Sequence, residues 1–464
     1  MAFFHGIGKA GRGVLIVCLA AFFLPAAALA GRAPTPSWEP QAEVLRESPA
    51  KPPAPPPVDW DQAAQRVPWL SGSPPSLVEE AMAPAVAASY SAARQWFVNS
   101  ISGDVIFPYY FDPIQGVYSY SNSMIRQLMS SRLLAQMAGE DPSLAGLHRR
   151  NLDFILNYWY RENSRGHGII FYDGESELGA NAMALRTLCA SPFFPQHEKE
   201  AEKIYQGIVY LFRDDGFKPF YHEPRYSYLP AYTLAYFSGE AILAITDYAR
   251  RTGNAEVWEK AAEIQEFYLK KYVDEIEENY YPAYVPWQTF SLCALYAHDP
   301  KPEYAEAVFV LNDKLMKIQR HGRHLGRFLD LAPDRPSGTH SSSDAVFTES
   351  LAYAYELSQR LGETGRKERY GRALAIAVYN LLRLQYVDLP PNAPYRKFIA
   401  GAFRSSAQNP GVRLDSVQHV MDAFRKILPV LGKEIPRGEG VAPSVADHDR
   451  GQAAQAGKPP GPGS

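Results

Sequence analysis

The hydrophobic pattern of the chain alternates, from about residue 121 to 430, between two kinds of helical segment. The first kind is rich in apolar and aromatic residues and poor in charge, as in residues 237–248. The second kind is amphipathic, as in residues 255–272, where Glu and Lys recur along one face. A helix that is apolar on most faces is buried, whereas a helix with a charged face meets solvent. The alternation therefore predicts an inner layer of apolar helices covered by an outer layer.

Six short signatures open these pairs of segments, at 121–127, 178–182, 237–241, 286–290, 347–351 and 414–419. Their spacing of roughly 49 to 67 residues is the length of one helical hairpin with its loop, and a regular period indicates a repeat architecture. We therefore predict an all-α fold in which six consecutive hairpins close into an (α/α)6 toroid.

Two elements precede the first hairpin. Residues 76–100 have the pattern of a helix, with Ser76 as N-cap and Glu79 three residues on as its capping-box partner. We expect this helix to pack outside the ring or to plug one end of it. Residues 104–119 are aromatic and interrupted by proline, which predicts a short strand or an irregular loop at the rim.

The two ends of the chain differ from the helical region in composition. Residues 1–30 have a basic start, an apolar run and an Ala28-Leu29-Ala30 cleavage site, which predict a signal peptide cleaved after Ala30 and a periplasmic or secreted protein. About 14 apolar residues are too few to span a bilayer. Residues 31–75 are dense in proline and read as an extended, disordered linker. We expect a toroid domain at 76–431 and a disordered tail at 432–464.

Composition excludes several classes of function. With 47 basic and 50 acidic residues among 464, the chain lacks the positive charge excess that nucleic-acid binding requires. After loss of the signal peptide only Cys189 and Cys293 remain, each in an apolar stretch, where a buried free thiol is expected and a disulfide stays an alternative. Neither cysteine has a neighbouring histidine. We therefore expect no metal site and no cofactor.

Polar residues interrupt the apolar helices mainly near their openings. Because the loops into the inner helices of a toroid converge at one end, we expect these side chains to share a cleft there. Buried polar groups need a partner or a ligand. An alternative is that they cap the helices and bond to one another across the ring. The set comprises Asn122, Arg126, Gln127, Asp173, Glu175, Glu177, Tyr236, Glu240, Trp287, Gln288, His340, Asp344, Glu349, Arg413, Asp415, Gln418 and His419.

Three stretches of the chain carry a resemblance to a known family. They are residues 236–245 followed by 251–254, residues 286–290, and Arg413-Leu-Asp-Ser-Val-Gln-His419. In these the chain resembles the six-hairpin glycosidase-like superfamily, in particular the C-terminal domain of D-glucuronyl C5-epimerases and related bacterial proteins, over roughly residues 105–430. The resemblance implies a toroid that acts on an extended sugar chain. Ser416 stands where the epimerase motif has tyrosine, and His419 comes one residue early, which disfavours epimerase chemistry.

Glycoside hydrolysis needs two carboxyl groups on either side of the scissile bond. The candidates are Glu177, Glu240, Asp344, Glu349 and Asp415, each near a hairpin entrance. We favour Glu240 with Asp415, and then Asp344 with Glu349.

Uronate epimerisation or elimination would instead need a cation for the carboxylate and a tyrosine or histidine to move a proton. Arg126, Arg404 and Arg413 could supply the cation, and the second set comprises Tyr228, Tyr236, His340 and His419. Further substrate contacts are expected from Asn122, Gln127, Glu177 and Trp287.

The sequence thus favours an exported protein that acts on a polysaccharide, an exopolysaccharide of its own envelope, with hydrolysis ahead of epimerisation or elimination. A third hypothesis has no chemistry and makes the ring a polysaccharide-binding part of an envelope export machinery, because aromatic side chains bind sugars without catalysis.

Overall fold

The computed structural model describes residues 65–70, 75–101, 103, 105–119, 121–222, 230–330 and 340–437. All of them belong to one compact unit, 37–464. The expected signal peptide, most of the expected linker and the chain beyond 437 lie outside the described residues. Within these ranges, every helix is too short or too polar to cross a membrane.

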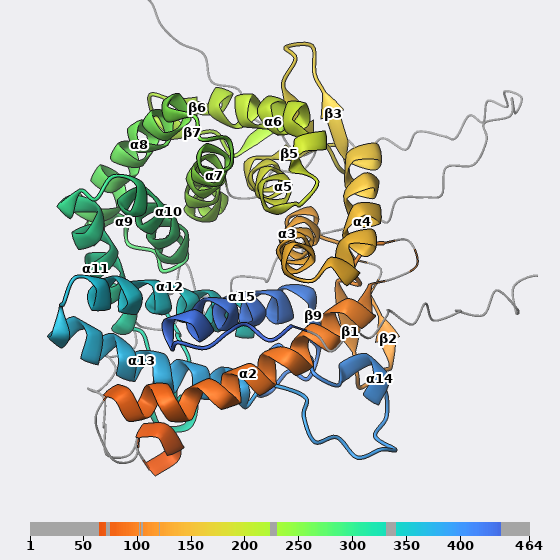
Figure 1. Cartoon of the computed structure of the whole chain (residues 1–464), viewed down its shortest axis with the longest axis vertical. Coiled ribbons are helices and arrows are strands. Elements are labelled where there is room, and N and C mark those ends of the chain that lie inside the picture. The colour runs from red at the N-terminus through yellow and green to blue at the C-terminus, as the bar shows by residue number, and fades with distance from the viewer. Residues whose placement is uncertain are drawn as a thin grey trace, which may run out of the picture. The chain divides into compact units, whose positions relative to one another are not determined.

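Six helices form an inner ring (Figure 1). In ring order they are α3 (Met124–Glu140), α5 (Leu178–Ala190), α7 (Pro230–Thr252), α10 (Tyr284–His298), α12 (Ser341–Arg360) and α15 (Leu414–Val430). Each packs against the next, and α15 packs against α3, so the ring is closed. These are the six apolar segments of the sequence, and the prediction of an all-α toroid is confirmed.

Five amphipathic helices cover the outside of the ring: α4 (Ala145–Tyr158), α6 (Glu198–Tyr210), α8 (Ala255–Leu269), α11 (Pro302–Met316) and α13 (Thr364–Leu382). Each follows its inner helix in the chain and packs against it. In α8, for example, Val257, Ala261 and Ile264 are buried, whereas Glu256 and Glu259 are exposed.

The sixth outer position is filled from the other end of the chain. No helix follows α15 in the described residues up to 437, and α2 (Pro75–Ser100) packs against α15 and α13 instead. Arg94 of α2 binds Asp141 at 2.5 Å, and Arg425 of α15 donates to Tyr90 of α2 at 3.1 Å. The expectation of six consecutive hairpins is therefore wrong for the last one, because the N-terminal helix supplies its second member.

A small three-stranded sheet lies beside the beginning of α15. Strands β1 (Tyr110–Asp112), β2 (Val117–Tyr118) and β9 (Val412–Arg413) pair antiparallel in the order β2-β1-β9. Tyr110 lies opposite Arg413, and β9 leads directly into α15. The strand expected within 104–119 is confirmed, and it fixes where the last inner helix begins.

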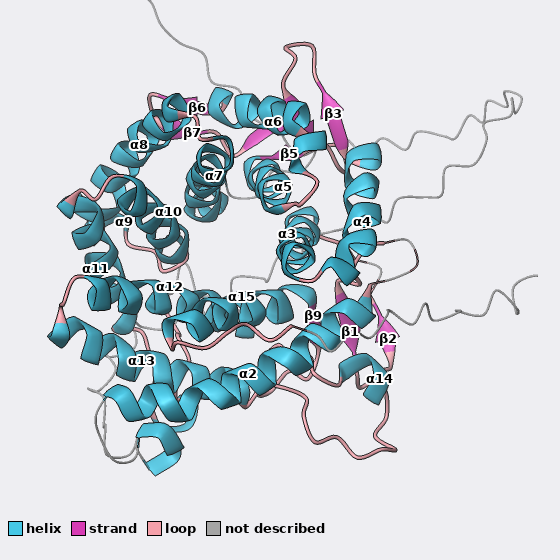
Figure 2. Ribbon diagram, viewed as in Figure 1, coloured by secondary structure: helices cyan, strands magenta, loops and turns pink. Residues whose placement is uncertain are grey.

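The other described strands form three short antiparallel pairs (Figure 2). They are β3 (Tyr160–Glu162) with β4 (Gly168–Ile170), β5 (Ser176–Glu177) with β8 (Phe220–His222), and β6 (Phe212–Arg213) with β7 (Gly216–Phe217). The pairs β3–β4 and β6–β7 are hairpins, whereas β5–β8 joins segments far apart in the chain. Short helical turns make up the rest: η1 (Pro68–Leu70), η2 (Pro142–Leu144), η3 (Phe194–Gln196), η4 (Lys270–Asp274), α9 (Ile276–Asn279), η5 (Gly322–His324) and α14 (Arg396–Ile399).

Two inner helices begin earlier than their sequence signatures. Helix α7 begins at Pro230 and α12 at Ser341, so the signatures at 237–241 and 347–351 lie about two turns inside them. Proline is favoured in the first turn of a helix, which suits Pro230 as a start. Glu240 and Glu349 therefore lie within helices, not at hairpin entrances as expected.

Glycines allow the inner helices to approach closely. A Cβ at Gly179 of α5 would lie 2.5 Å from Cδ1 of Phe237 on α7, and one at Gly239 of α7 would lie 2.5 Å from Cβ of Trp287 on α10. Both distances are too short for real atoms, so these contacts depend on the absence of a side chain.

The ordered part of the domain extends beyond the expected boundaries. Val67 is fully buried against Leu325 and Ile376, although residues 31–75 were expected to be disordered. At the other end, Ile435 packs against the core although it falls in the expected tail. Cys189 and Cys293 are both free thiols as expected, but only Cys189 is buried, whereas Cys293 is half-buried.

Candidate functional site

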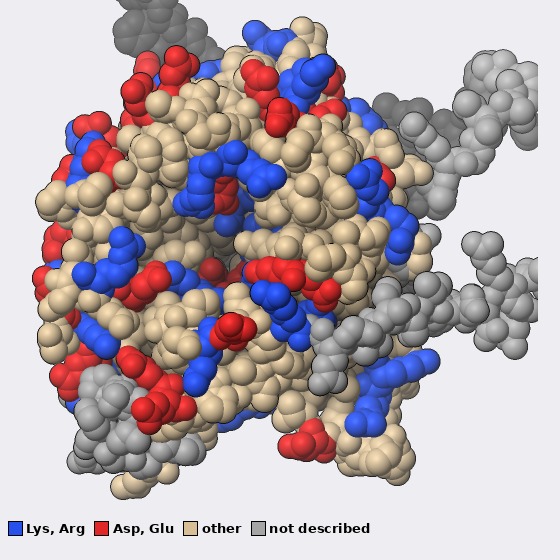
Figure 3. Space-filling model, in the orientation of Figure 1, with Lys and Arg blue, Asp and Glu red and all other residues tan. Residues whose placement is uncertain are grey.

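A cavity of about 420 Å³ lies inside the ring, and all six inner helices line it. Its volume falls within the range of roughly 300 to 1,000 Å³ that is usual for small-molecule sites. Figure 3 shows this face hollowed near the centre of the ring, with basic and acidic side chains gathered around the hollow. The polar lining includes Arg132, Arg186, Asp247, Glu349, Tyr353, Gln418, His419 and Asp422.

The lining residues recur every three or four positions along each inner helix, which places them on one face. On α12 they are Glu349, Tyr353, Glu356, Leu357 and Arg360. On α7 they lie in the C-terminal half of the helix, whereas on α10 they begin at Trp287 in the first turn. The cavity therefore includes part of the entrance that the sequence predicted and extends along the inner helices beyond it.

Two carboxyl groups from neighbouring helices meet in the cavity. Asp422 of α15 accepts hydrogen bonds from Arg132 of α3 and from Gln418 one turn earlier. Arg132 in turn donates to Gln136 at 3.0 Å. A guanidinium and an amide thus hold this carboxylate in one orientation. Asp422 is therefore the ion-paired member of the two carboxyl groups.

Glu349 of α12 has the opposite environment. Among the described residues it has no hydrogen-bond or ion-pair partner, and it lines the cavity. Burial raises the pKa of Glu349 to about 8, and the nearby charge of Asp422 acts in the same direction. At neutral pH this carboxyl group is protonated, whereas its neighbour Asp422 forms an ion pair with Arg132. Such a division within a pair of carboxyl groups is typical of acid and base assignments in enzymes.

Aromatic rings form another part of the lining. Trp287 of α10 and His419 of α15 meet edge to face at 6.2 Å. Tyr353 lies 4.8 Å from Phe290, and the ammonium group of Lys426 lies 3.8 Å from the centre of the tyrosine ring. Burial lowers the pKa of His419 to about 4, so this imidazole is neutral at pH 7. The rings offer flat apolar surfaces of the kind that sugars stack on.

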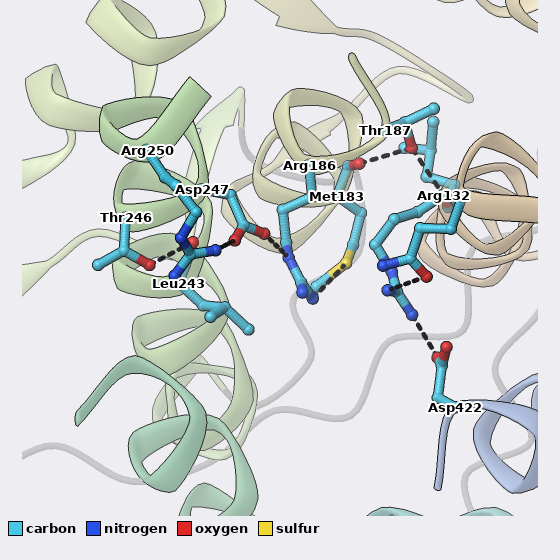
Figure 4. Close-up of polar contacts among 11 residues, drawn as sticks. Arg132, Met183, Arg186, Thr187, Leu243, Thr246, Asp247, Arg250 and Asp422 are labelled. Carbon is cyan, nitrogen blue, oxygen red and sulfur yellow. Dashed lines mark hydrogen bonds and ion pairs between the residues drawn. The ribbon is translucent and has the colours of Figure 1, made fainter. Parts of the chain in front are cut away.

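An arginine cluster lies on α5 and α7. Asp247 accepts from Nε of Arg186 at 2.8 Å and from Arg250 at 3.1 Å (Figure 4). All three residues line the cavity. Two guanidinium groups therefore share one carboxylate at this wall.

Glu240, the first catalytic candidate, lies on α7 about one turn before Leu243, which lines the cavity. Its side chain does not line the cavity and is only 2% exposed. Among the described residues, Oε2 of Glu240 has no hydrogen-bond partner, and it lies 2.7 Å from where a Cβ of Gly179 would be. Burial raises the pKa of Glu240 to about 8. This carboxyl group is packed between helices, away from the cavity.

Asp415, the expected partner of Glu240, is bound by two arginines. Arg126 donates to it at 2.7 Å, and Arg413 donates to both of its oxygens at 3.0 and 2.7 Å. Although burial opposes ionisation, the two guanidinium groups hold the pKa of Asp415 far below its ordinary value. A carboxylate this stable is a poor proton donor or acceptor, so the cluster is better suited to joining α3 to α15.

Two other candidates, Asp344 and Arg404, make structural contacts away from the cavity. Asp344 accepts from the backbone of Phe328 at 2.9 Å, from Arg327 at 3.1 Å and from Asn380 at 3.2 Å, and it is 1% exposed. The guanidinium of Arg404 lies 4.8 Å from the ring of Tyr386. Neither residue lines the cavity.

The remaining candidates lie around the beginnings of the inner helices. Gln127 binds the backbone of Phe107 through both ends of its amide and donates to Asn122 at 2.9 Å. His340 is the N-cap residue of α12 and Glu177 that of α5. Tyr236 meets Tyr281 through their hydroxyl groups at 3.4 Å. These contacts match the alternative in which entrance residues bond to one another.

Four residues that the sequence analysis selected line the cavity: Trp287, Glu349, Gln418 and His419. Sequence reasoning did not select Arg132, Arg186, Asp247, Tyr353 or Asp422. A signal was available, because each is a polar residue on a largely apolar inner helix, three or four positions from another lining residue. In the described parts of the chain, no group of three or more His, Cys, Asp and Glu side chains could hold a metal ion.

No protein-family model matches the sequence, and no curated protein matches it. Solved structures do match the fold. D-mannose isomerase has a TM-score of 0.54 at 12% identity, covering 76% of this chain and 97% of that chain. An unsaturated glucuronyl hydrolase specific for heparin has a TM-score of 0.53 at 9% identity, covering 76% and 99%.

Cellobiose 2-epimerase from Bacillus thermoamylovorans has a TM-score of 0.52 at 10% identity, covering 71% of this chain and 95% of that chain. Identities this low establish a shared fold and no more. The chain has the six-hairpin glycosidase-like fold that its motifs resemble.

Proposed function

We propose that the protein is a carbohydrate-acting enzyme, a glycoside hydrolase, with Glu349 as general acid and Asp422 as the second carboxyl group. The observation that carries this proposal is the pair itself: two carboxyl groups in one cavity, of which Glu349 has a raised pKa and Asp422 forms an ion pair with Arg132. The solved structures that share the fold include a hydrolase and two sugar isomerising enzymes by name, which supports a sugar as substrate.

Each group has a defined role in this reaction. Glu349 gives its proton to the glycosidic oxygen as the bond to the anomeric carbon breaks. The positive charge that develops on the sugar is stabilised by Asp422, which Arg132 and Gln418 hold in place. A water molecule then adds its hydroxyl to the anomeric carbon, and its proton returns to a carboxylate. Trp287 and Tyr353 offer surfaces for the sugar ring.

We propose a polysaccharide of the cell envelope as substrate, in line with the expected signal peptide. A role beside the envelope export machinery is part of the same proposal. The cavity would take the end of a chain or a short oligosaccharide, because its volume is that of a small-molecule site.

Epimerisation or elimination of a uronate is the second candidate, because Tyr353 and His419 share the cavity with Arg132 and Arg186. Two features make it the weaker one. Burial raises the pKa of Tyr353 above its ordinary value, which keeps the phenol protonated. Burial lowers the pKa of His419 to about 4, which makes it a weak base.

The test incubates the whole chain with neutral and uronate polysaccharides and follows reducing ends, absorbance of unsaturated uronates and solvent deuterium incorporation together. We expect new reducing ends without unsaturation or deuterium. Glu349→Gln should lower the rate by about 10²- to 10⁴-fold, the usual contribution of a general acid. Glu303→Gln, on the outer helix α11, is the matched control and should leave the rate unchanged.

Other outcomes would overturn the proposal in distinct ways. Unsaturated products would indicate a lyase, and deuterium without cleavage an epimerase. Binding of a polymer with no signal in any of the three assays would make the ring a binding scaffold.

A further inference from the structure

We propose that Arg186, Asp247 and Arg250 form a subsite for an anionic group of the saccharide, so that the substrate is an acidic sugar bearing a carboxylate or a sulfate. This inference rests on the proposed function of the same cavity. It adds the chemical class of the substrate.

The charges at this subsite do not balance. Asp247 uses one oxygen for Arg186 at 2.8 Å and the other for Arg250 at 3.1 Å, so a single carboxylate serves two guanidinium groups (Figure 4). The nearest ionic contacts elsewhere in the cavity are one to one, as between Arg132 and Asp422 or Lys426 and Glu356. The positive excess is therefore concentrated on α5 and α7.

The ion pair of Arg186 and Asp247 is largely shielded from water, which strengthens its electrostatic interactions. The side chains of Arg186 and Asp247 are only 12% and 20% exposed. Among the described residues, Arg186 forms one hydrogen bond besides that to Asp247, with the sulfur of Met183 at 4.0 Å, which is a weak acceptor. Guanidinium groups bind carboxylates and sulfates through paired hydrogen bonds that strengthen away from water. The unused donors of Arg186 at the cavity wall fit such a group.

The subsite faces the proposed acid–base pair. In the ring order given above, α5 lies opposite α12 and α7 lies opposite α15. Arg186 and Asp247 are thus across the cavity from Glu349 and Asp422. A sugar that fills the cavity would present its glycosidic bond to one wall and a charged substituent to the other.

A purely structural role for the arginines accounts for part of the arrangement. Arg250 lies in the last turn of α7, where a cation is favoured by the helix dipole. One arginine would suffice to neutralise Asp247, however, and Arg186 remains largely buried beside it. At this wall a single carboxylate, Asp247, therefore pairs with two guanidinium groups.

The experiment measures binding by calorimetry in the Glu349→Gln background, where turnover is blocked. The probes are three oligosaccharides of equal length: a neutral cello-oligosaccharide, an oligoglucuronate and a sulfated cello-oligosaccharide. We expect at least one anionic probe to bind about 10- to 100-fold more tightly than the neutral one, as for hydrogen bonds to charged groups. The preference should weaken with added salt. The two anionic probes distinguish carboxylate from sulfate recognition.

Arg186→Gln and Arg250→Gln, each added to the same background, should abolish most of this preference. Arg250 is exposed, so its variant stays informative if Arg186→Gln does not fold. Arg366→Gln on the outer helix α13, where Arg366 binds Glu306, is the matched control.

Equal binding of neutral and anionic probes, with cleavage of neutral chains by the unaltered protein, would overturn the inference and leave the hydrolase intact. An anionic preference that both arginine variants retain would also overturn it. If no probe binds and the unaltered protein cleaves no polysaccharide, the inference and the proposed function both fail.

Discussion

Glu240 provides a quantitative test of the electrostatics inside the ring. The residue is 2% exposed, its Oε2 has no hydrogen-bond partner in the part of the chain that the structure describes, and burial raises its pKa from 4.5 to about 8. The perturbation is Glu240→Gln, which keeps the size of the side chain and removes its ability to ionise. Because Glu240 does not line the cavity, the test concerns stability and is independent of the proposed reaction.

The direction of the pH effect on stability follows from the pKa of Glu240 in the unfolded and folded states. In the unfolded chain the carboxyl group loses its proton near pH 4.5, whereas in the folded ring it keeps the proton until about pH 8. The unfolded state therefore gains stability relative to the folded state as the pH rises between these values. Each unit of pKa difference is worth about 1.4 kcal/mol. Between about pH 5 and about pH 7.5, the unaltered protein should lose about 3 kcal/mol that the variant keeps.

The assay is urea unfolding of both proteins at about pH 5 and about pH 7.5, followed by tryptophan fluorescence. The quantity of interest is the difference between variant and unaltered protein at the higher pH minus that at the lower pH, because any fixed cost of the amide cancels in it. We expect about 3 kcal/mol in favour of the variant. Glu303→Gln on α11 is the control and should give a value near zero. The same free-energy difference at both pH values would refute a raised pKa for Glu240.

Three further predictions follow from other contacts. The kcat/KM of the proposed hydrolysis should fall as the pH rises through about 8, since Glu349 then loses the proton that it donates, and a profile still rising there would contradict its role as acid. Asp415→Asn should lower the free energy of unfolding by about 3 kcal/mol in urea, because it leaves two arginines without their carboxylate, and a change below about 1 kcal/mol would count against the cluster. Gly179→Ala should cost about 1 to 3 kcal/mol in urea unfolding, because its methyl group would overlap Phe237, whereas Gly139→Ala, with open space around it, should cost nothing.

The architecture was largely predictable from the sequence, because each inner helix must bury most of its surface and each outer helix must keep a charged face. Periodicity could not reveal the partner of α15. The sequence of α2 identifies a helix, but its position in the sixth outer place depends on contacts such as that between Tyr90 and Arg425, which are 335 residues apart. The sequence also predicts the starts of α7 and α12 too late, because the polar signatures indicate helix entrances but lie about two turns inside these helices.

The site was less predictable for a related reason. Glu240 and Glu349 are both acidic residues inside apolar helices, with similarly raised pKa values, yet one is packed against Gly179 and the other lines a cavity. Which of them is open depends on the volumes of side chains contributed by neighbouring helices. Asp415 was a catalytic candidate in the sequence, but in the structure it pairs with Arg126 and Arg413, which are 289 and 2 residues away in the chain. The pairing with the distant Arg126 could not be seen in the sequence.

Closure of the ring by α2 has a consequence for when activity can arise. Helix α2 is the first long helix of the described chain, and it packs against the last one, α15. The apolar face of α2 therefore lacks this partner until α15 has been synthesised. The same late helix brings Asp422 to the cavity. A nascent chain that has completed five hairpins already contains Glu349, but it lacks both the facing carboxylate and the seam that holds α2. The proposed acid–base pair and closure of the ring therefore both depend on the last inner helix, α15.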